Sequence, residues 1–102
     1  MQRLVELSKI FSDNNRVKIL ALILRDKEVC VCEICDTLSL SQPLISRHLK
    51  QMKEVNILQT RKDKKWIHYS LISPTDTCLQ AFIREIKKDT EPLEKLVICD
   101  AK

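Results

Sequence analysis

The chain has 102 residues, which is enough for one domain around one hydrophobic core. Its longest aliphatic run, ILALIL at residues 19–24, is far shorter than the roughly 20 residues that cross a bilayer, so we expect a cytoplasmic protein. The net charge is +4, and the excess lies in residues 41–70, where seven basic and two acidic side chains give +5. Such a local density of cations is typical of a surface that binds a polyanion.

The first two expected elements are helices. Apolar residues recur at helical spacing in residues 3–12, and Asp13 can cap a second helix over about residues 14–26. The second helix is apolar on more than one side, so we expect it to lie in the centre of the fold. The chain contains no glycine and only three prolines, which also favours helices over tight turns.

A helix-turn-helix unit is expected over about residues 31–55. A short helix over residues 31–38 leads through the turn SLS to a longer helix over about residues 42–55. Ser41 can cap that longer helix, and Asn56 can adopt the left-handed conformation that ends it.

A β-hairpin is expected next, as a wing over about residues 57–72. Two β-prone runs, at 57–61 and 66–72, flank the polar turn KDKK. On the second strand we expect Ile67 to share a face with other apolar side chains and His68 to point outward.

The C-terminal part predicts two more helices. The residues 73–76, SPTD, are typical of a capping box with proline at the first helical position, and the helix that follows runs to about Lys88. A last short helix is expected at 91–99. The expected fold of residues 1–102 is a single domain, mainly α with a β-hairpin wing: a winged helix-turn-helix with about five to six helices.

The order helix, short turn, helix and basic hairpin predicts DNA binding. In such a motif the second helix enters the major groove with its N-terminal residues against base edges. Gln42 suits adenine and Arg47 suits guanine, whereas lysines suit phosphates and His48 is expected to be a hydrogen-bonded core histidine. The expected DNA contacts are Gln42, Ser46, Arg47, Lys50 and Lys53 on the helix, and Arg61, Lys62, Lys64 and Lys65 on the wing.

Three of the five cysteines fall in EVCVCEIC, directly before the DNA-reading helix: Cys30, Cys32 and Cys35. With an odd number of cysteines we expect reduced thiols rather than a disulfide framework. Three thiolates without a nearby histidine form a soft site that selects thiophilic ions, and a three-coordinate pyramid also suits the lone pair of As(III) or Sb(III). Zinc prefers four ligands, so Cys78, Cys99, a histidine or water would have to complete a zinc site.

The spacing of these cysteines does not suit a straight helix. With about 100° per residue, Cys32 and Cys35 lie about 60° apart and Cys30 lies roughly opposite Cys32. All three can hold one ion only if Cys30 precedes the helix or the first turn deforms. We therefore expect ligand binding to distort the helix that supports the recognition helix.

The stretch from EVCVCEIC through SQPLISRHL to KKWIHYSL closely resembles the ArsR/SmtB family of winged-helix metalloregulators, and FSDNNRVKILALIL resembles the family's second helix. The likeness covers about residues 3–72. It implies a homodimeric repressor that binds an inverted repeat in double-stranded operator DNA and releases it when an inducer binds. It also implies As(III) or Sb(III) ligands at Cys30, Cys32 and Cys35, and dimerisation helices at about 3–12 and 74–99.

This chain departs from the family pattern at three places. The family usually has glycine at the position of Asn56 and in the wing tip, where this chain has KDKK. The zinc-sensing branch also has aspartate and histidine ligands on a late helix. Asp76 has no such histidine partner here, so we expect that second site to be absent or altered.

Three other functions compete with this one. The cysteines could serve a thiol redox or persulfide sensor on the same DNA-binding fold, because reactive cysteines often lie at helix starts, where the thiol pKa is lowered. A thiol–disulfide oxidoreductase built on the spacing of Cys32 and Cys35 is disfavoured, because that motif normally accompanies a βαβ pattern. A structural zinc site is equally disfavoured. We therefore expect neither an enzyme nor an organic cofactor.

Overall fold

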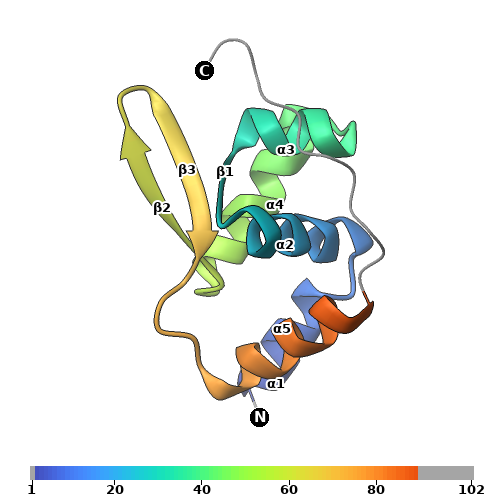
Figure 1. Ribbon diagram of the computed structural model, residues 1–102. Helices are drawn as coiled ribbons and strands as arrows, with labels where there is room; N and C mark the ends of the chain where they lie inside the picture. Colours follow the sequence, from blue (N-terminus) through green and yellow to red (C-terminus); the bar gives the residue numbers. More distant parts are fainter. Residues whose placement is uncertain (1, 90–102) are drawn as a thin grey trace.

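The computed structural model describes residues 2–89, and the helices and hairpin expected within that range are present (Figure 1). The helices predicted at 14–26 and 31–38 have those bounds, and those predicted at 3–12 and 42–55 differ by one or two residues. The helix predicted at 91–99 lies outside the described residues. The elements are α1 (Gln2–Ile10), α2 (Asn14–Asp26), β1 (Glu28–Cys30), α3 (Val31–Leu38), α4 (Gln42–Glu54), β2 (Leu58–Asp63), β3 (Trp66–Leu71) and α5 (Thr77–Asp89).

Helix α2 lies at the centre of the molecule, as predicted. The neighbouring helices α1 and α5 lie on one side of α2, and α3, α4 and the sheet lie on the other side (Figure 1). Its N-terminus is capped by Asp13, whose carboxylate accepts the N–H of Asn15 at 2.8 Å. Ile19, Leu20 and Leu22 are fully buried on more than one side of this helix, so α2 joins both halves of one core.

The short strand β1 was not predicted from the sequence. The sheet has three antiparallel strands in the order β1-β3-β2, so β3 is its centre. In the register, Glu28 pairs with Ser70 and Cys30 pairs with His68. The wing is therefore attached through β1 to the start of α3.

The prediction that His68 points outward is wrong. His68 is only 9% exposed, whereas Ile67 is 44% exposed. His68 shares a face of the sheet with its register partner Cys30, which is buried, and β1 is the strand that the sequence did not reveal. Because successive side chains alternate across a strand, burying His68 turns Ile67 to the other face.

Without glycine, the chain uses residues with side chains wherever the backbone must be left-handed. Asn56, directly after the C-cap of α4, has φ of 58°, as predicted. Lys64 opens the two-residue connection between β2 and β3 with φ of 57°. Ser39 (φ 56°) and Lys27 (φ 70°) end α3 and α2.

Helix α5 begins three residues later than predicted. Asp76 caps it, because Asp76 Oδ2 accepts the N–H of Leu79 at 3.1 Å. Pro74 therefore lies before the helix rather than at its first position, and follows a cis peptide bond with Ser73. Within residues 2–89, no helix has both the length and the apolar character needed to cross a bilayer.

Candidate nucleic-acid interface and thiol cluster

Helix α4 has a buried face and an exposed polar face. Ser41 caps it, because Ser41 Oγ accepts the N–H of Leu44 at 3.4 Å. Ile45, Leu49 and Met52 are fully buried against the core. The predicted DNA contacts on this helix all lie on its exposed face: Gln42, Ser46, Arg47, Lys50 and Lys53.

His48 is a core histidine, as predicted. It is 3% exposed, and its Nδ1 accepts a hydrogen bond from Nε of Arg16 on α2 at 3.0 Å. Burial lowers the pKa of His48 below its ordinary value, which favours the neutral ring that can accept this bond. His48 therefore fixes α4 against α2 from within the core.

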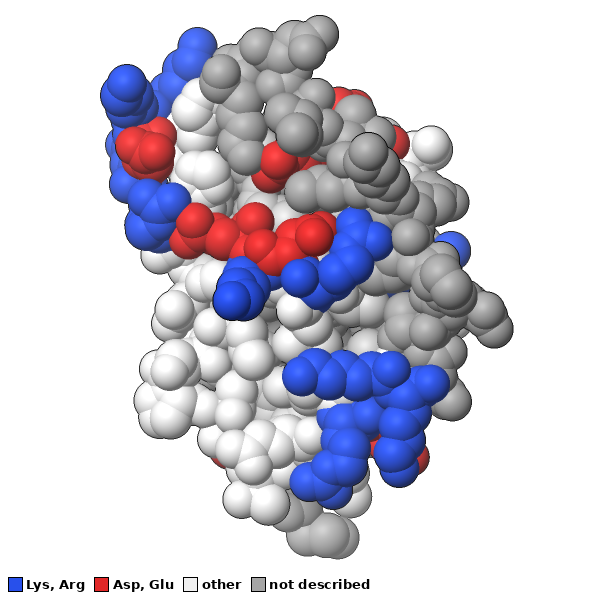
Figure 2. Space-filling view, in the orientation of Figure 1, with Lys and Arg blue, Asp and Glu red and all other residues white. Residues whose placement is uncertain are grey.

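The wing carries a second group of exposed cations, seen as a line of blue side chains at the upper left of Figure 2. Arg61 is held by Glu28 of β1, with Nη2–Oε1 at 2.7 Å and Nε–Oε2 at 3.0 Å. That hydrogen-bonded pair raises the pKa of Arg61. Lys65 Nζ lies 5.6 Å from the centroid of the Trp66 ring. All four predicted wing contacts are exposed: Arg61, Lys62, Lys64 and Lys65.

Cys30 lies at the junction of a strand and a helix. It is the last residue of β1 and the N-cap residue of α3, and it is 1% exposed. Glu33, itself only 4% exposed, accepts the backbone N–H of Cys30 through Oε1 at 3.0 Å. Cys30 therefore precedes α3. This is one of the two arrangements in which all three sulfurs can hold one ion.

The three clustered cysteines line one groove. Cys30, Cys32 and Cys35 form one part of its wall, and Gln42, the first residue of α4, forms another. The wing contributes Lys65, Trp66 and Ile67, and the remaining lining residues are Val31 and Asp36. The groove therefore connects the thiol cluster with both predicted DNA-reading elements. Trp66 and Ile67 were missed by sequence reasoning as groove residues, because only the pairing of β1 with β3 brings them there.

The thiols themselves are not arranged as a finished metal centre. Among residues 2–89, no group of three cysteine, histidine or acidic side chains is placed to hold a metal ion. Cys30 and Cys35 are in the reduced state, but Cys32 is disulfide-bonded, so the prediction of reduced thiols is wrong for Cys32. Cys99 lies outside the described residues.

The electrostatic surroundings of Cys35 favour the protonated thiol. Burial raises the pKa of Cys35, and the neighbouring Asp36 and Cys30 raise it further. This is opposite to the lowering expected at a helix start, because Cys35 lies beyond the first turn of α3 and beside a carboxylate. A ligand that binds here must therefore displace a proton from the sulfur.

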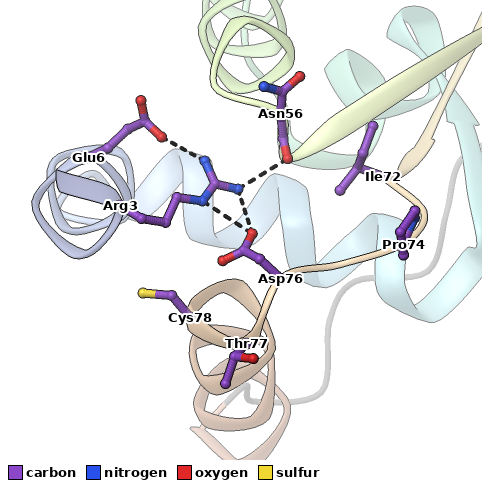
Figure 3. Close-up of a pocket in the computed structure, with 8 residues that line it drawn as sticks. All are labelled: Arg3, Glu6, Asn56, Ile72, Pro74, Asp76, Thr77 and Cys78. Carbon is purple, nitrogen blue, oxygen red and sulfur yellow. Dashed lines mark hydrogen bonds and ion pairs between the residues drawn. The ribbon is translucent and has the colours of Figure 1, made fainter. Parts of the chain in front are cut away.

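Cys78 is not part of this groove. It is a free thiol near the start of α5 and lines a separate pocket with Arg3 and Asp76 (Figure 3).

The chain resembles known regulators in sequence and in fold. Residues 13–60 match the family described as bacterial regulatory protein, arsR family. The arsenic resistance transcriptional regulator ArsR1 of Pseudomonas putida is 38% identical over 78 residues, which cover 76% of this chain and 61% of that protein. The arsenical resistance operon repressor of Escherichia coli is 45% identical over 67 residues, covering 66% and 57%. The chain thus spans about three fifths of the length of these two relatives.

Among solved structures, HlyU from Vibrio cholerae N16961 superimposes with a TM-score of 0.74 at 30% identity, covering 85% of this chain and 90% of that one. A structure of reduced HlyU from the same organism gives the same TM-score and identity. These matches agree with the helix-turn-helix of α3 and α4 and with the wing of β2 and β3. The chain therefore belongs to the ArsR family of bacterial regulatory proteins, with the winged helix-turn-helix fold of that family.

Proposed function

We propose that this protein is a transcriptional repressor of arsenical resistance. It binds operator DNA as a homodimer, and leaves the DNA when As(III) or Sb(III) binds Cys30, Cys32 and Cys35. The names of the two bacterial relatives, both regulators of arsenic resistance, support the class of inducer. The same names describe regulators and not catalysts, so we propose no enzymatic activity.

The observation that carries this proposal is the shared groove. Three cysteines, the first residue of α4 and the wing residues Lys65, Trp66 and Ile67 all line it. A ligand bound to the sulfurs would touch the elements that read DNA, so its binding free energy can act directly on their position.

The DNA interface that we propose combines two groups of exposed side chains. Gln42 and Arg47 read base edges, and the remaining polar residues of α4 position the helix on phosphates. On the wing, Arg61 contributes less than its neighbours because Glu28 already holds its guanidinium. Full phosphate contacts on the wing are assigned to Lys62, Lys64 and Lys65.

The dimer that we propose joins two copies through α1 and α5. Leu4 and Val5 on α1 are each 51% exposed, which leaves an apolar surface on that helix. The predicted helix at 91–99 would extend the same interface. Such a dimer places two recognition helices about one turn of DNA apart, as an inverted repeat requires.

Ligand binding by this cluster is a balanced exchange of thiol protons for water. Arsenite as As(OH)3 reacts with three thiols to form three As–S bonds and three water molecules, with no change in oxidation state. Cys32 must be reduced before it can take part. Because Cys30 ends β1 whereas Cys32 and Cys35 lie on α3, drawing the sulfurs together would move α3 relative to the strand that carries the wing.

The test is a titration of the reduced protein bound to labelled operator DNA with arsenite, antimonite, cadmium and peroxide in parallel. We expect arsenite and antimonite to release the DNA and Cys32→Ser to abolish that release, with Cys78→Ser as the matched control that behaves as wild type. If Cys32→Ser still released the DNA normally with arsenite, the assignment of the ligands would be wrong.

A redox-sensing repressor is the second candidate, and the disulfide at Cys32 favours it. The similarity to HlyU, which has been solved in a form described as reduced, supports the same direction. Here peroxide or polysulfide would release the DNA, a dithiol reductant would restore binding, and arsenite would have no effect on the reduced complex.

A further inference from the structure

Arg3 on α1 makes hydrogen bonds within its own helix and to two other segments of the fold (Figure 3). Its Nε and Nη2 donate to Asp76 Oδ1 at 3.1 and 2.9 Å. Its Nη2 also donates to the backbone carbonyl of Asn56 at 3.2 Å, and Nη1 donates to the carbonyl of Val55. Within α1 itself, Nη1 contacts Glu6 Oε1 at 2.6 Å. We call the contacts of Arg3 with Val55, Asn56 and Asp76 the Arg3 clasp.

The partners of Arg3 in the clasp lie at the C-terminal end of α4 and at the start of α5. Val55 is the C-cap of α4, and Asn56 is the left-handed residue that turns the chain toward β2. Carbonyl groups at a helix C-terminus lack intrahelical partners and carry partial negative charge, so they are good acceptors for a guanidinium. Asp76 caps α5 through its other carboxylate oxygen, Oδ2. One side chain thus connects α1, the end of the recognition helix and the start of α5.

The clasp is partly shielded from water. The side chain of Arg3 is 27% exposed and that of Asp76 is 42% exposed, and Ile72 and Pro74 line the same pocket. The hydrogen bond from Arg3 holds the pKa of Asp76 below its ordinary value, so the carboxylate stays charged at neutral pH. Ion pairs with this degree of exposure contribute little to overall stability, so removing the pair should leave the fold intact.

We propose that Arg3 is a positioning residue for DNA binding, which holds α4 and the wing in a fixed orientation relative to the α1–α5 pair. The proposal rests on the function proposed above, because in a dimer joined through α1 and α5 this orientation sets the separation of the two recognition helices. The groove borders the N-terminal end of α4, at Gln42, whereas the clasp holds its C-terminal end.

The geometry requires arginine at this position. The acceptors lie on two different segments, and a planar guanidinium with five N–H donors can reach them at once. A lysine ammonium is a single point charge and would bind either the carboxylate or the carbonyls. Arg3→Lys should therefore behave much more like Arg3→Met than like the wild type.

The first experiment needs no DNA and uses the full chain. The orientation of α4 relative to α1 is measured by residual dipolar couplings in wild type, Arg3→Met and the control Lys9→Met, which removes an exposed cation from the same helix. We expect a changed or broadened orientation and faster amide exchange at residues 55–57 in Arg3→Met alone, with unchanged helix content by circular dichroism. An orientation identical to the wild type in Arg3→Met would overturn the proposal.

The second experiment measures the spacing preference on DNA. Wild type and variants are titrated with inverted repeats whose half-site separation is lengthened or shortened by about half a helical turn, roughly 5 base pairs. We expect Arg3→Met to lose about fivefold to twentyfold in affinity for the matched spacing and much less for the altered spacings, while the dimerisation constant from sedimentation stays constant. An equal loss on all spacings would overturn the positioning role, because a general structural defect has that effect.

A third variant separates charge from capping. Asp76→Asn keeps a good N-cap for α5 but removes the carboxylate that pairs with Arg3. We expect its spacing preference to weaken in the same way, and the double variant with Arg3→Met to be no worse than Arg3→Met alone. Fully additive losses would count against the clasp. If wild type bound no operator DNA, the proposed function would fail, whereas the dipolar couplings would still decide whether Arg3 sets the orientation.

Discussion

The two ends of helix α4 are held in different ways. At its N-terminal end, Gln42 borders an open groove that three cysteines share with the wing. At its C-terminal end, Val55 and Asn56 are bound through their backbone carbonyls by Arg3. The N-terminal end thus faces a groove in which we propose that a ligand binds. The C-terminal end is fixed to α1, one of the helices that we assign to the dimer interface. The difference teaches that a ligand in the groove would tilt α4 about its C-terminal end, and so change the orientation of the recognition helix relative to the α1–α5 pair.

The largest effect is expected at the N-terminal end. Replacing Cys30 by serine removes one sulfur while keeping a residue that is well suited to the N-cap of α3. Coupling between two sites typically changes an affinity by about 5-fold to 150-fold. For Cys30→Ser we expect the ratio of the affinities for operator DNA without and with arsenite to fall to about one. Fluorescence anisotropy with labelled operator DNA gives the ratio directly. A ratio that stayed at the wild-type value would remove Cys30 from the ligand set.

The next prediction compares the two ends by the DNA contacts that each makes. Gln42→Ala should relax the preference for adenine at one position, at a cost of about 1–3 kcal/mol, because a bidentate base contact is lost. Lys53→Met should instead weaken all sequences alike and reduce the slope of log affinity against log salt by about one. Titrations on matched and single-mismatch sites at several salt concentrations distinguish these outcomes. Equal behaviour of the two variants would contradict the assignment of base reading to the N-terminal end.

Elements of the fold could be predicted from the sequence only where their signal was local. Helices α2 and α4 have caps within the sequence, at Asp13 and Ser41, and an apolar period that fixes their bounds. Strand β1 is three residues long, too short for any periodicity, and exists through its pairing with residues 68–70. That pairing brings the cysteines to the wing, so their chemistry was predictable but the groove was not.

The Arg3 clasp had no sequence signal either. Arg3 and Asp76 are 73 positions apart, and each looks like an ordinary charged residue near a helix terminus. Only the packing of α1 beside α5 brings them together. The predicted capping box at 73–76 is wrong, because α5 starts at Thr77 and Asp76, not Ser73, caps it.

A smaller effect is expected where β1 meets the wing. Glu28 binds Arg61 through two hydrogen bonds, so Glu28→Gln should release the guanidinium toward phosphate. We expect affinity for DNA to rise a few-fold at low salt, with a salt slope steeper by up to one. The double variant Glu28→Gln with Arg61→Met is the control, and it should lose this gain. An affinity unchanged in Glu28→Gln would show that Arg61 already contacts DNA in the paired state.

The smallest effect concerns the pH dependence of the protein's stability, through the Asp76 carboxylate that Arg3 binds near the C-terminal end of α4. The pKa of Asp76 is lower in the folded protein than in the unfolded chain, so its contribution is present above about pH 4 and is lost as the pH falls through the folded value. The difference in melting temperature between wild type and Asp76→Asn should therefore be small but measurable at pH 7, and should shrink toward pH 3. A difference that grew on acidification would contradict the lowered pKa.

The wing tip turns without glycine, at a lysine in the left-handed region. Glycine at Lys64 would bend there with less steric cost but would also leave the tip free to sample many shapes before meeting DNA. With lysine, the residue that makes the bend also supplies a cation, and part of the ordering that docking demands has already taken place during folding. Recognition by this wing should therefore carry a smaller entropic penalty than recognition by a glycine-tipped one.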